Sequence, residues 1–490
     1  MRISPVLFIL GKVLLVLGCA MLLPLAVALS YNQGDALPFV HSIVPTWLCA
    51  TLLLFFCRKS AHTPLRQREG YLFVTLVWLA AAIFGALPFN FGLTLSANFT
   101  DALFESMSGF STTGVTSFTD IESLPKGLLF WRALTPWLGG AGIVMLFIAV
   151  LRGKDGSGAG AQIFNAELQS GGELADKITP RIGDGVKAMF VIFVGLTLAE
   201  ILLLLLGGMD LYDATVHAFG TLSTGGFSSH NAGIAYYNSA YIEWVIIAFM
   251  FIASINLGLY YQLLMRNKSK IFRDEETRVF VLICVLATVL ITAVLYMQHV
   301  YLGRGFGYTI RQAAFQTISV ITTTGFSTEN YNIWPVFPRG LIFLLIFVGG
   351  CIGSTASSIK VSRVIVGVKA CRNELLEMVH PRLVKKLYFN KKPISQNTVR
   401  HLLFFVITFC FFTLAGALLL TLSGLTLTEA LTTSLSCISN VGSGLGGLSH
   451  PVDYATLNGL AKYVLIFNML IGRLEIFTVL VLFLPGVWKK

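Results

Sequence analysis

The chain alternates between long apolar runs and short polar stretches over almost its whole length. A helix needs about 20 apolar residues to cross a lipid bilayer. Ten runs approach or exceed that length, and the pattern predicts a spanning helix over each: 5–30, 42–57, 71–93, 127–151, 183–207, 241–265, 279–300, 339–369, 401–422 and 459–484. A cleaved signal segment is the alternative for residues 1–30. The run is long for one and no clear cleavage site follows it, so we expect a retained helix.

Four short amphipathic segments lie between consecutive runs, at 100–111, 212–223, 310–322 and 428–438. They are too short and too polar to cross a membrane, which predicts re-entrant half-helices. Each belongs to a repeated unit in which a glycine follows an Asp, Gln or Glu after thirteen residues: Asp101 to Gly114, Asp213 to Gly226, Gln312 to Gly325 and Glu429 to Gly442. The four glycines are 112, 99 and 117 residues apart. Four such units in one chain predict a ring with approximate fourfold symmetry.

The predicted fold is therefore an all-α polytopic membrane protein, with ten transmembrane helices and four re-entrant pore loops in pseudo-fourfold helix–pore-loop–helix repeats. Two extra helices occupy 1–69, and the repeats follow at 70–152, 153–278, 279–371 and 372–490. The connector 152–182 is rich in Gly and charged residues. Its Gly153-Lys154 pair resembles part of a phosphate-binding loop, but Asp155 follows where Ser or Thr is needed, so we predict no nucleotide site in this chain.

Composition and charge support a membrane protein. The chain is 55% hydrophobic and 12% charged, whereas soluble domains carry about 25% charged residues. The net charge of +11 follows the predicted topology, since 27 of the 35 Lys and Arg residues fall on the side of the N-terminus. This asymmetry is the positive-inside rule, so both termini are predicted to be cytoplasmic. The charge then suits anionic lipid, or the acidic face of a cytosolic partner, rather than nucleic acid.

The residues around the four glycines suit an ion-selectivity filter. Irregular backbone is tolerated at membrane depth only where protein buries it or where it lines a water-filled cavity, and carbonyl oxygens there can replace the hydration shell of an ion. No carboxylate lies within three residues of the glycines, which favours a monovalent cation. A turn after an amphipathic helix is the simpler interpretation of any one loop, but four in register favour a filter. The filter residues are predicted to be Thr112, Thr113, Gly114, Thr224, Gly225, Gly226, Thr323, Thr324, Gly325, Asn440, Val441 and Gly442.

Two further features fall inside predicted spans. Glycines and hydroxyl residues interrupt the span 339–369, where the small residues either pack helices closely or form an unwound segment beside a cavity. Its candidate gate residues are Gly349, Gly350, Gly353, Ser354, Thr355 and Lys360. The second feature is Arg473 in the last span, since a charge at membrane depth is costly and usually functional. Pairing with Glu475 is the structural alternative, but residues two apart point to different sides of a helix.

These motifs resemble the Trk/Ktr/HKT superfamily of cation transporters, and within it the TrkH/TrkG type of bacterial potassium uptake protein. The resemblance covers nearly the whole chain. It implies a potassium-channel-like fold in the inner membrane, with the four glycines in the filter, a gating loop over Val348–Lys360 and Arg473 beneath the filter. It also implies a homodimer that docks a cytosolic regulatory subunit binding NAD or ATP. Gly114 favours potassium, because plant relatives with serine there tend toward sodium.

The chain departs from the family pattern at Ala356-Ser357-Ser358, where relatives often have glycines, and at Ser443, where proline is common. Within transport, the alternatives are a sodium carrier and coupling of potassium to sodium or protons. A polytopic membrane enzyme is the alternative from another class. It would need clustered His, Glu or Asp at depth, whereas His217 and His230 are scattered and Glu200 and Asn256 are isolated polar residues that suit packing.

Overall fold

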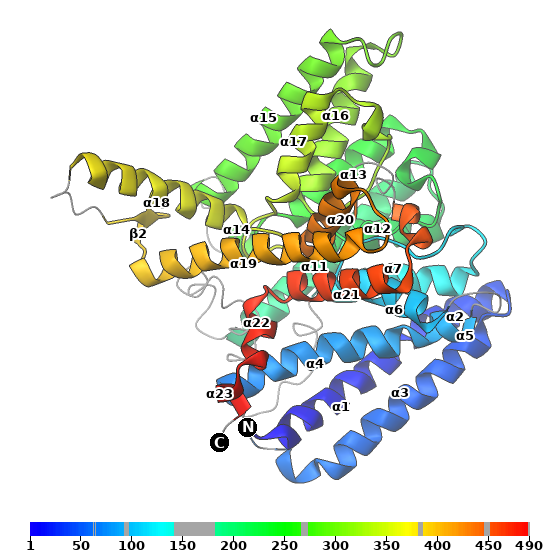
Figure 1. Cartoon of the computed structure of the whole chain (residues 1–490). Helices are drawn as coiled ribbons and strands as arrows, with labels where there is room; N and C mark the ends of the chain where they lie inside the picture. Colours follow the sequence, from blue (N-terminus) through cyan, green and yellow to red (C-terminus); the bar gives the residue numbers. More distant parts are fainter. Residues whose placement is uncertain are drawn as a thin grey trace.

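The computed structural model describes residues 1–490 apart from 62, 64, 93–97, 142–181, 266–272, 381–385, 445–450 and 489–490. The described part is almost wholly helical (Figure 1), and a two-residue hairpin, β1 (Tyr388–Phe389) with β2 (Lys392–Pro393), is its one small sheet. The predicted connector 152–182 and the end of the predicted span 127–151 fall almost wholly outside the described residues.

The N-terminal helices form an antiparallel pair. Helices α1 (Ile3–Ala20) and α2 (Leu22–Tyr31) make one apolar stretch of 29 residues, and α3 (Ala36–Phe56) returns beside α1 (Figure 1). Small residues allow the close approach, because a Cβ atom on Gly18 would overlap the Trp47 ring. The predicted spans 5–30 and 42–57 therefore form helices that pair with each other.

Four further helices are long and apolar enough to cross a membrane. They are α4 with α5 (Gln67–Gly85 and Leu87–Gly92), α11 (Ile182–Leu206), α15 (Glu275–Met297) and α19 (Gln396–Thr421). With the N-terminal pair, this gives six clear candidate spans among the described residues. Helix α7 (Lys126–Gly140) covers the described start of the predicted span 127–151.

Two of the predicted spans, 241–265 and 459–484, are sharply bent helix pairs rather than continuous helices. The first consists of α13 (Ala240–Ala253) and α14 (Leu257–Met265), bent by 91°. The second consists of α21 (Gly459–Arg473), α22 (Phe477–Leu480) and η8 (Val481–Phe483), bent by 105°. At the first bend the Ser254 carbonyl accepts a hydrogen bond from Cys351 N at 2.9 Å. At the second, Glu475 and Ile476 have φ angles of 55° and 45°, which a helix does not allow.

The predicted interrupted span 339–369 is broken over a longer stretch. Helix α17 (Val336–Ile346) ends well before α18 (Val361–Val379) begins, and residues 347–360 between them are irregular. In Figure 1, α18 and the β-hairpin extend away from the body of the molecule, whereas the start of α1 and α23 (Pro485–Trp488) lie at one common end.

All four predicted half-helices form. They are α6 (Phe99–Phe110), α12 (Leu211–Leu222), α16 (Gly305–Ile321) and α20 (Leu427–Ser439). Helix α16 begins five residues earlier than predicted, and the other boundaries agree within one residue. Polar side chains cap two of these helices: Asp210 caps α12, and Thr426 with Glu429 forms a capping box on α20. Each helix ends at one of the four glycine segments, so these helices position the candidate site.

Candidate functional site

The same backbone turn follows each of the four short helices. Its first residue lies in the left-handed region, with φ of 58° at Thr112, 54° at Thr224, 57° at Thr323 and 54° at Asn440. Residues other than glycine rarely adopt positive φ. Two positions later comes the glycine, with φ of 82°, 65°, 79° and 87° at Gly114, Gly226, Gly325 and Gly442. Four strained residues at equivalent places indicate a conformation that the surrounding structure enforces.

One hydrogen bond recurs in all four turns. The backbone N–H of the middle residue donates to the carbonyl five positions earlier, which belongs to the last turns of the short helix. The pairs are Thr113 with Ser108 at 2.9 Å, Gly225 with Gly220 at 2.8 Å, Thr324 with Ser319 at 2.9 Å and Val441 with Ser436 at 2.9 Å. The bond satisfies a helix-end carbonyl and fixes the direction in which the chain leaves the helix.

The four segments close into a ring. A Cβ atom placed on Gly114 would lie closer than 3.0 Å to the carbonyl oxygen of Gly225 in the second segment. The same close approach joins Gly226 to Thr324, Gly325 to Val441, and Gly442 back to Thr113. Only glycine allows both the positive φ and this proximity of backbones. The structure thus brings all twelve predicted filter residues into one closed arrangement, which we call the ring.

Side chains support the ring in a less regular way. Ser108 Oγ donates to the Val115 carbonyl at 2.6 Å, and Ser319 Oγ makes the equivalent bond to Phe326 at 2.5 Å. In the second segment Gly220 stands at that position and has no side chain. Asn440 in the fourth segment instead donates from Nδ2 to Thr113 Oγ1 at 3.0 Å, which ties the last segment to the first. The backbone is therefore fourfold, whereas the side-chain support is not.

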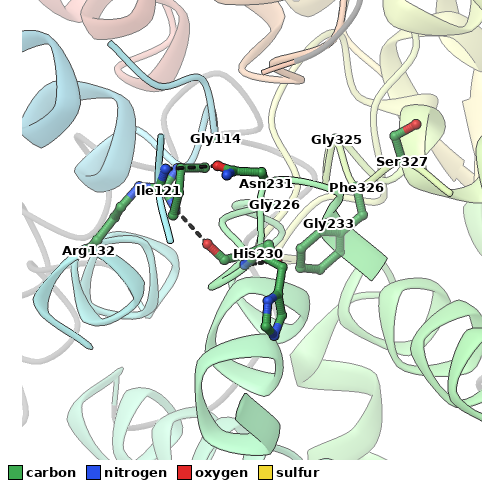
Figure 2. Close-up of a pocket in the computed structure, with 11 residues that line it drawn as sticks. Gly114, Ile121, Arg132, Gly226, His230, Asn231, Gly233, Gly325, Phe326 and Ser327 are labelled. Carbon is green, nitrogen blue, oxygen red and sulfur yellow. Dashed lines mark hydrogen bonds between the residues drawn. The ribbon is translucent and has the colours of Figure 1, made fainter. Parts of the chain in front are cut away.

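The mouth of the ring is a small pocket lined by Gly114, Gly226 and Gly325, by Arg132 of α7 and by residues that follow the glycines (Figure 2). His230 lies there, with Nδ1 3.3 Å from a Glu122 oxygen, Nε2 3.1 Å from an Asp213 oxygen and its ring stacked on Tyr236. Burial alone would lower the pKa of His230, but hydrogen bonds and charges from Asp213 and Glu122 outweigh burial and raise this pKa.

The irregular residues 347–360, here called the loop, are bound to several helices. Gly349 N donates to the Ile359 carbonyl at 2.9 Å within the loop, and Leu257 N donates to the Gly353 carbonyl at 3.1 Å. Gly353 has φ of 75° and lies against the Asn256 side chain. Of the two interpretations that the sequence left open, the structure shows the unwound segment.

Arg473 links the loop to the ring. Its Nη1 lies within hydrogen-bond distance of Thr112 Oγ1 at 3.2 Å, the Thr355 carbonyl at 3.1 Å and Ser357 Oγ at 3.0 Å, and its Nη2 donates to the Gly139 carbonyl at 2.8 Å. Ser357 N also donates to Thr323 Oγ1 at 2.9 Å. The loop therefore bonds directly to the third segment of the ring and is joined to the first through Arg473.

Glu475 pairs with a different residue. Its Oε2 accepts a hydrogen bond from Arg363 Nη2 at 2.5 Å, which joins α18 to the bend after α21. This agrees with the expectation that Arg473 and Glu475 point to different sides. Of the other candidate gate residues, the Gly350 carbonyl accepts a hydrogen bond from Val361 N at 3.3 Å, Ser354 Oγ donates to the Cys351 carbonyl at 2.6 Å, and Lys360 Nζ donates to the Ala356 carbonyl within the loop.

The sequence did not single out Glu276 as a residue of the site. Its Oε1 accepts hydrogen bonds from Ile352 N at 2.9 Å and Ser362 N at 3.1 Å, so one carboxylate holds both the loop and the start of α18. In the sequence Glu276 is part of an acidic triplet at the start of an apolar span, a pattern typical of a solvated helix start. Asn256 was noticed as an isolated polar residue, but its contact with the loop was not predicted.

Comparison with known proteins places this geometry in context. A family model described as TrkH, a cation transport protein, matches residues 37–489. The chain is 36% identical over 484 residues to the Trk system potassium uptake protein TrkH of Escherichia coli K12, covering 98% of each chain. It is 32% identical to TrkG of the same organism, covering 96% of each. The crystal structure of the potassium transporter TrkH from Vibrio parahaemolyticus aligns over 100% of both chains, with a TM-score of 0.89 and 33% identity.

Proposed function

We propose, from the premise that this chain belongs to the TrkH family of cation transport proteins, that it carries potassium ions across the bacterial cytoplasmic membrane through the ring. Its relatives are named as potassium uptake proteins rather than enzymes. The proposal depends on one observation above all: four quasi-equivalent backbone turns close on one another through their glycines.

The ring suits a dehydrated monovalent cation. Backbone carbonyls of the four segments would replace the water shell of the ion. The four short helices end at the ring, so the negative ends of their dipoles favour a cation there. The residues of the ring are glycine, threonine, valine and asparagine, without a carboxylate, whereas divalent selectivity usually uses rings of Asp or Glu. Glycine at position 114 supports potassium rather than sodium by resemblance to the family.

The loop and Arg473 would form the gate. A guanidinium group held between the ring and the loop puts a positive charge on the ion path, which opposes the passage of a cation. The bonds from Arg473 to Thr355 and Ser357 also hold the loop against the ring. Movement of the loop would release both the obstruction and the charge, so the two act as one barrier.

The wider architecture is part of the proposal. It has ten membrane crossings, four helix–pore-loop–helix repeats with the boundaries predicted above, and both termini in the cytoplasm. By resemblance to the family, the protein would form a homodimer and bind a cytosolic Trk-type subunit. Control by NAD or ATP would come from that subunit, since we expect this chain to bind no nucleotide.

Ion flux with purified protein tests the proposal. Reconstituted vesicles would be loaded with potassium, rubidium, sodium or lithium, and fluxes compared with and without a regulatory subunit. We expect potassium and rubidium to pass much faster than sodium and lithium. Equal fluxes of potassium and sodium would overturn potassium selectivity. A flux that requires a sodium or proton gradient would show coupled transport, and rescue of growth in low potassium provides a cellular check.

A further inference from the structure

The non-helical stretch after each ring glycine, here called the strand, is braced from one equivalent position in three of the four repeats. Nine residues before the four glycines stand Glu105, His217, Gln316 and Thr433, each on a short helix and each buried. His217 Nε2 lies 3.0 Å from Ser228 Oγ, and Gln316 Nε2 lies 3.2 Å from Ser327 Oγ. Ser228 and Ser327 both come two residues after a ring glycine. The bracing side chain thus differs in chemistry among repeats that have the same backbone conformation.

In the first repeat the bracing residue, Glu105, belongs to a buried ion pair with Arg132. Glu105 Oε2 accepts hydrogen bonds from Thr116 Oγ1 at 2.8 Å and from Ser117 N at 2.9 Å, both on the strand after Gly114. Glu105 Oε1 accepts from Arg132 Nε at 2.5 Å. The Glu105 side chain is 0% exposed and that of Arg132 is 2% exposed. Bonds of this kind are shorter and stronger than neutral ones and hold a fixed geometry.

Arg132 also bonds to the second repeat. Its Nη1 donates to the Ser228 carbonyl at 2.8 Å, on the strand after Gly226. Its guanidinium carbon lies 3.7 Å from the centre of the Phe227 ring. Arg132 therefore reaches one strand through Glu105 and the next strand directly, and it lines the mouth beside Gly114 and Gly226 (Figure 2).

We propose that Arg132 is a positioning residue that sets ion selectivity, by fixing the distance between the first and second ring segments. The inference rests on the proposed function of the ring. A site that chooses between two alkali ions depends on backbone positions held within about 0.5 Å. A planar guanidinium can serve Glu105 and Ser228 at once because its donors lie in a rigid fork, whereas an ammonium group at the same place cannot.

The test compares the potassium-to-sodium permeability ratio of purified variants in vesicles. Arg132→Lys keeps a positive charge opposite Glu105 but loses the hydrogen bond to the Ser228 carbonyl. We expect its ratio to fall about tenfold, the consequence of one lost charge-assisted hydrogen bond. Arg311→Gln is the control, since it removes a partly buried ion pair, Arg311 Nε to Glu243 Oε2 at 2.8 Å, between α16 and α13. We expect it to lower thermal stability and leave the ratio unchanged.

A ratio is independent of how much protein folds, so a purely structural role of Arg132 would not change it. If the wild-type protein selects potassium and Arg132→Lys selects it equally well, the proposal for Arg132 is wrong and the proposed function stands. If the wild-type protein does not select potassium, the proposed function itself fails. Should Arg132→Lys not fold, Phe227→Leu decides the question, since it removes the aromatic side chain that packs on the guanidinium and helps to hold it at the Ser228 carbonyl. We expect a smaller fall in the ratio, and an unchanged ratio would overturn the proposal.

Discussion

The ring and the loop lie in contact, yet they are built in opposite ways. The ring repeats one turn four times, with φ of the first residue between 54° and 58°. The loop occurs once and is held by different partners on each side: Ser254 at the first bend, Glu276 on α15, Thr323 in the ring and Arg473 on α21. Repetition is found where an ion would be surrounded, and irregularity where passage would be controlled.

This difference follows from what each region needs. Surrounding a spherical ion with equal oxygens requires equal backbone geometry, which four similar sequences supply. A control element needs two alternative states, and bonds to several helices allow movement of any of those helices to act on it. Changes in the ring should therefore alter which ion passes, and changes in the loop should alter how fast it passes.

The largest effect is expected from a side chain on the ring itself. In Gly114→Ser, the added Cβ would lie closer than 3.0 Å to the Gly225 carbonyl at a residue with φ of 82°. Left-handed backbone alone costs a non-glycine residue roughly 1–2 kcal/mol. We expect the potassium-to-sodium permeability ratio to fall by more than about tenfold, measured by flux in vesicles.

Gly340→Ala serves as its control. Gly340 lies on α17, where an added Cβ would meet nothing within 4 Å. We expect this variant to keep the wild-type ratio and flux. An unchanged ratio in Gly114→Ser would count against the assignment of Gly114 to a filter.

The ring could be predicted from the sequence because its signal is local. A short helix followed by a glycine turn needs a fixed spacing, and Gly114, Gly226, Gly325 and Gly442 display that spacing four times. Their assembly then follows from the requirement that irregular backbone be satisfied within the membrane.

The supports of the loop could not be predicted, because they join residues far apart in the chain. The bend at Ser254 depends on a hydrogen bond from Cys351, and the bend after Arg473 is tied to Arg363 through Glu475. Hydrophobic periodicity reports which residues are apolar, and it carries no information about such tertiary bonds. For the same reason, the sequence pattern predicts a solvated helix start at Glu276 and does not show its bonds to Ile352 and Ser362.

Removal of the charge between ring and loop should give the next largest effect. In Arg473→Ala, the positive charge and its bonds to Thr112, Thr355 and Ser357 are lost. We expect basal potassium flux to rise, by about tenfold if the charge contributes only 1.4 kcal/mol to the barrier. The permeability ratio should change little, because the backbone of the ring is kept. Arg473→Lys, which retains the charge, should keep flux low, and unaltered flux in Arg473→Ala would remove Arg473 from the gate.

A moderate effect is expected where the loop meets α15. Glu276→Ala removes the acceptor for Ile352 N and Ser362 N, whereas Glu276→Gln keeps an oxygen at that position. Hydrogen bonds to a charged group contribute about 1.5–3 kcal/mol each. We expect Glu276→Ala to lower the unfolding temperature and to change basal flux a few-fold, with a normal permeability ratio. Glu276→Gln should lie between this variant and the wild type, and a normal flux in Glu276→Ala would show that this anchor does not control the loop.

The smallest effect concerns the mouth, where His230 makes titratable contacts with Glu122 and Asp213. The charged and titratable groups around His230 are Glu122, Asp213, Tyr236, Tyr237 and the neighbouring His217, and Asp213 and Glu122 raise the pKa of His230. A raised pKa means that the folded state binds the proton more tightly than the unfolded state. The resulting stability is complete below the unfolded pKa of about 6.5 and is lost as the pH rises through the folded value. We expect a loss of roughly 1 kcal/mol or less, as for other partly exposed ion pairs.

Thermal unfolding of the wild type and of His230→Gln between about pH 5 and 9 would measure this contribution, since the histidine pKa lies inside that range. The wild type should lose stability relative to the variant as the pH rises, and the two curves should become parallel above the folded pKa. His230 bonds to Asp213 and Glu122 rather than to the ring segments, so the permeability ratio should stay constant across the same range. A ratio that follows the titration would place His230 among the selectivity determinants. It would also extend the region that controls ion choice from the ring to its mouth.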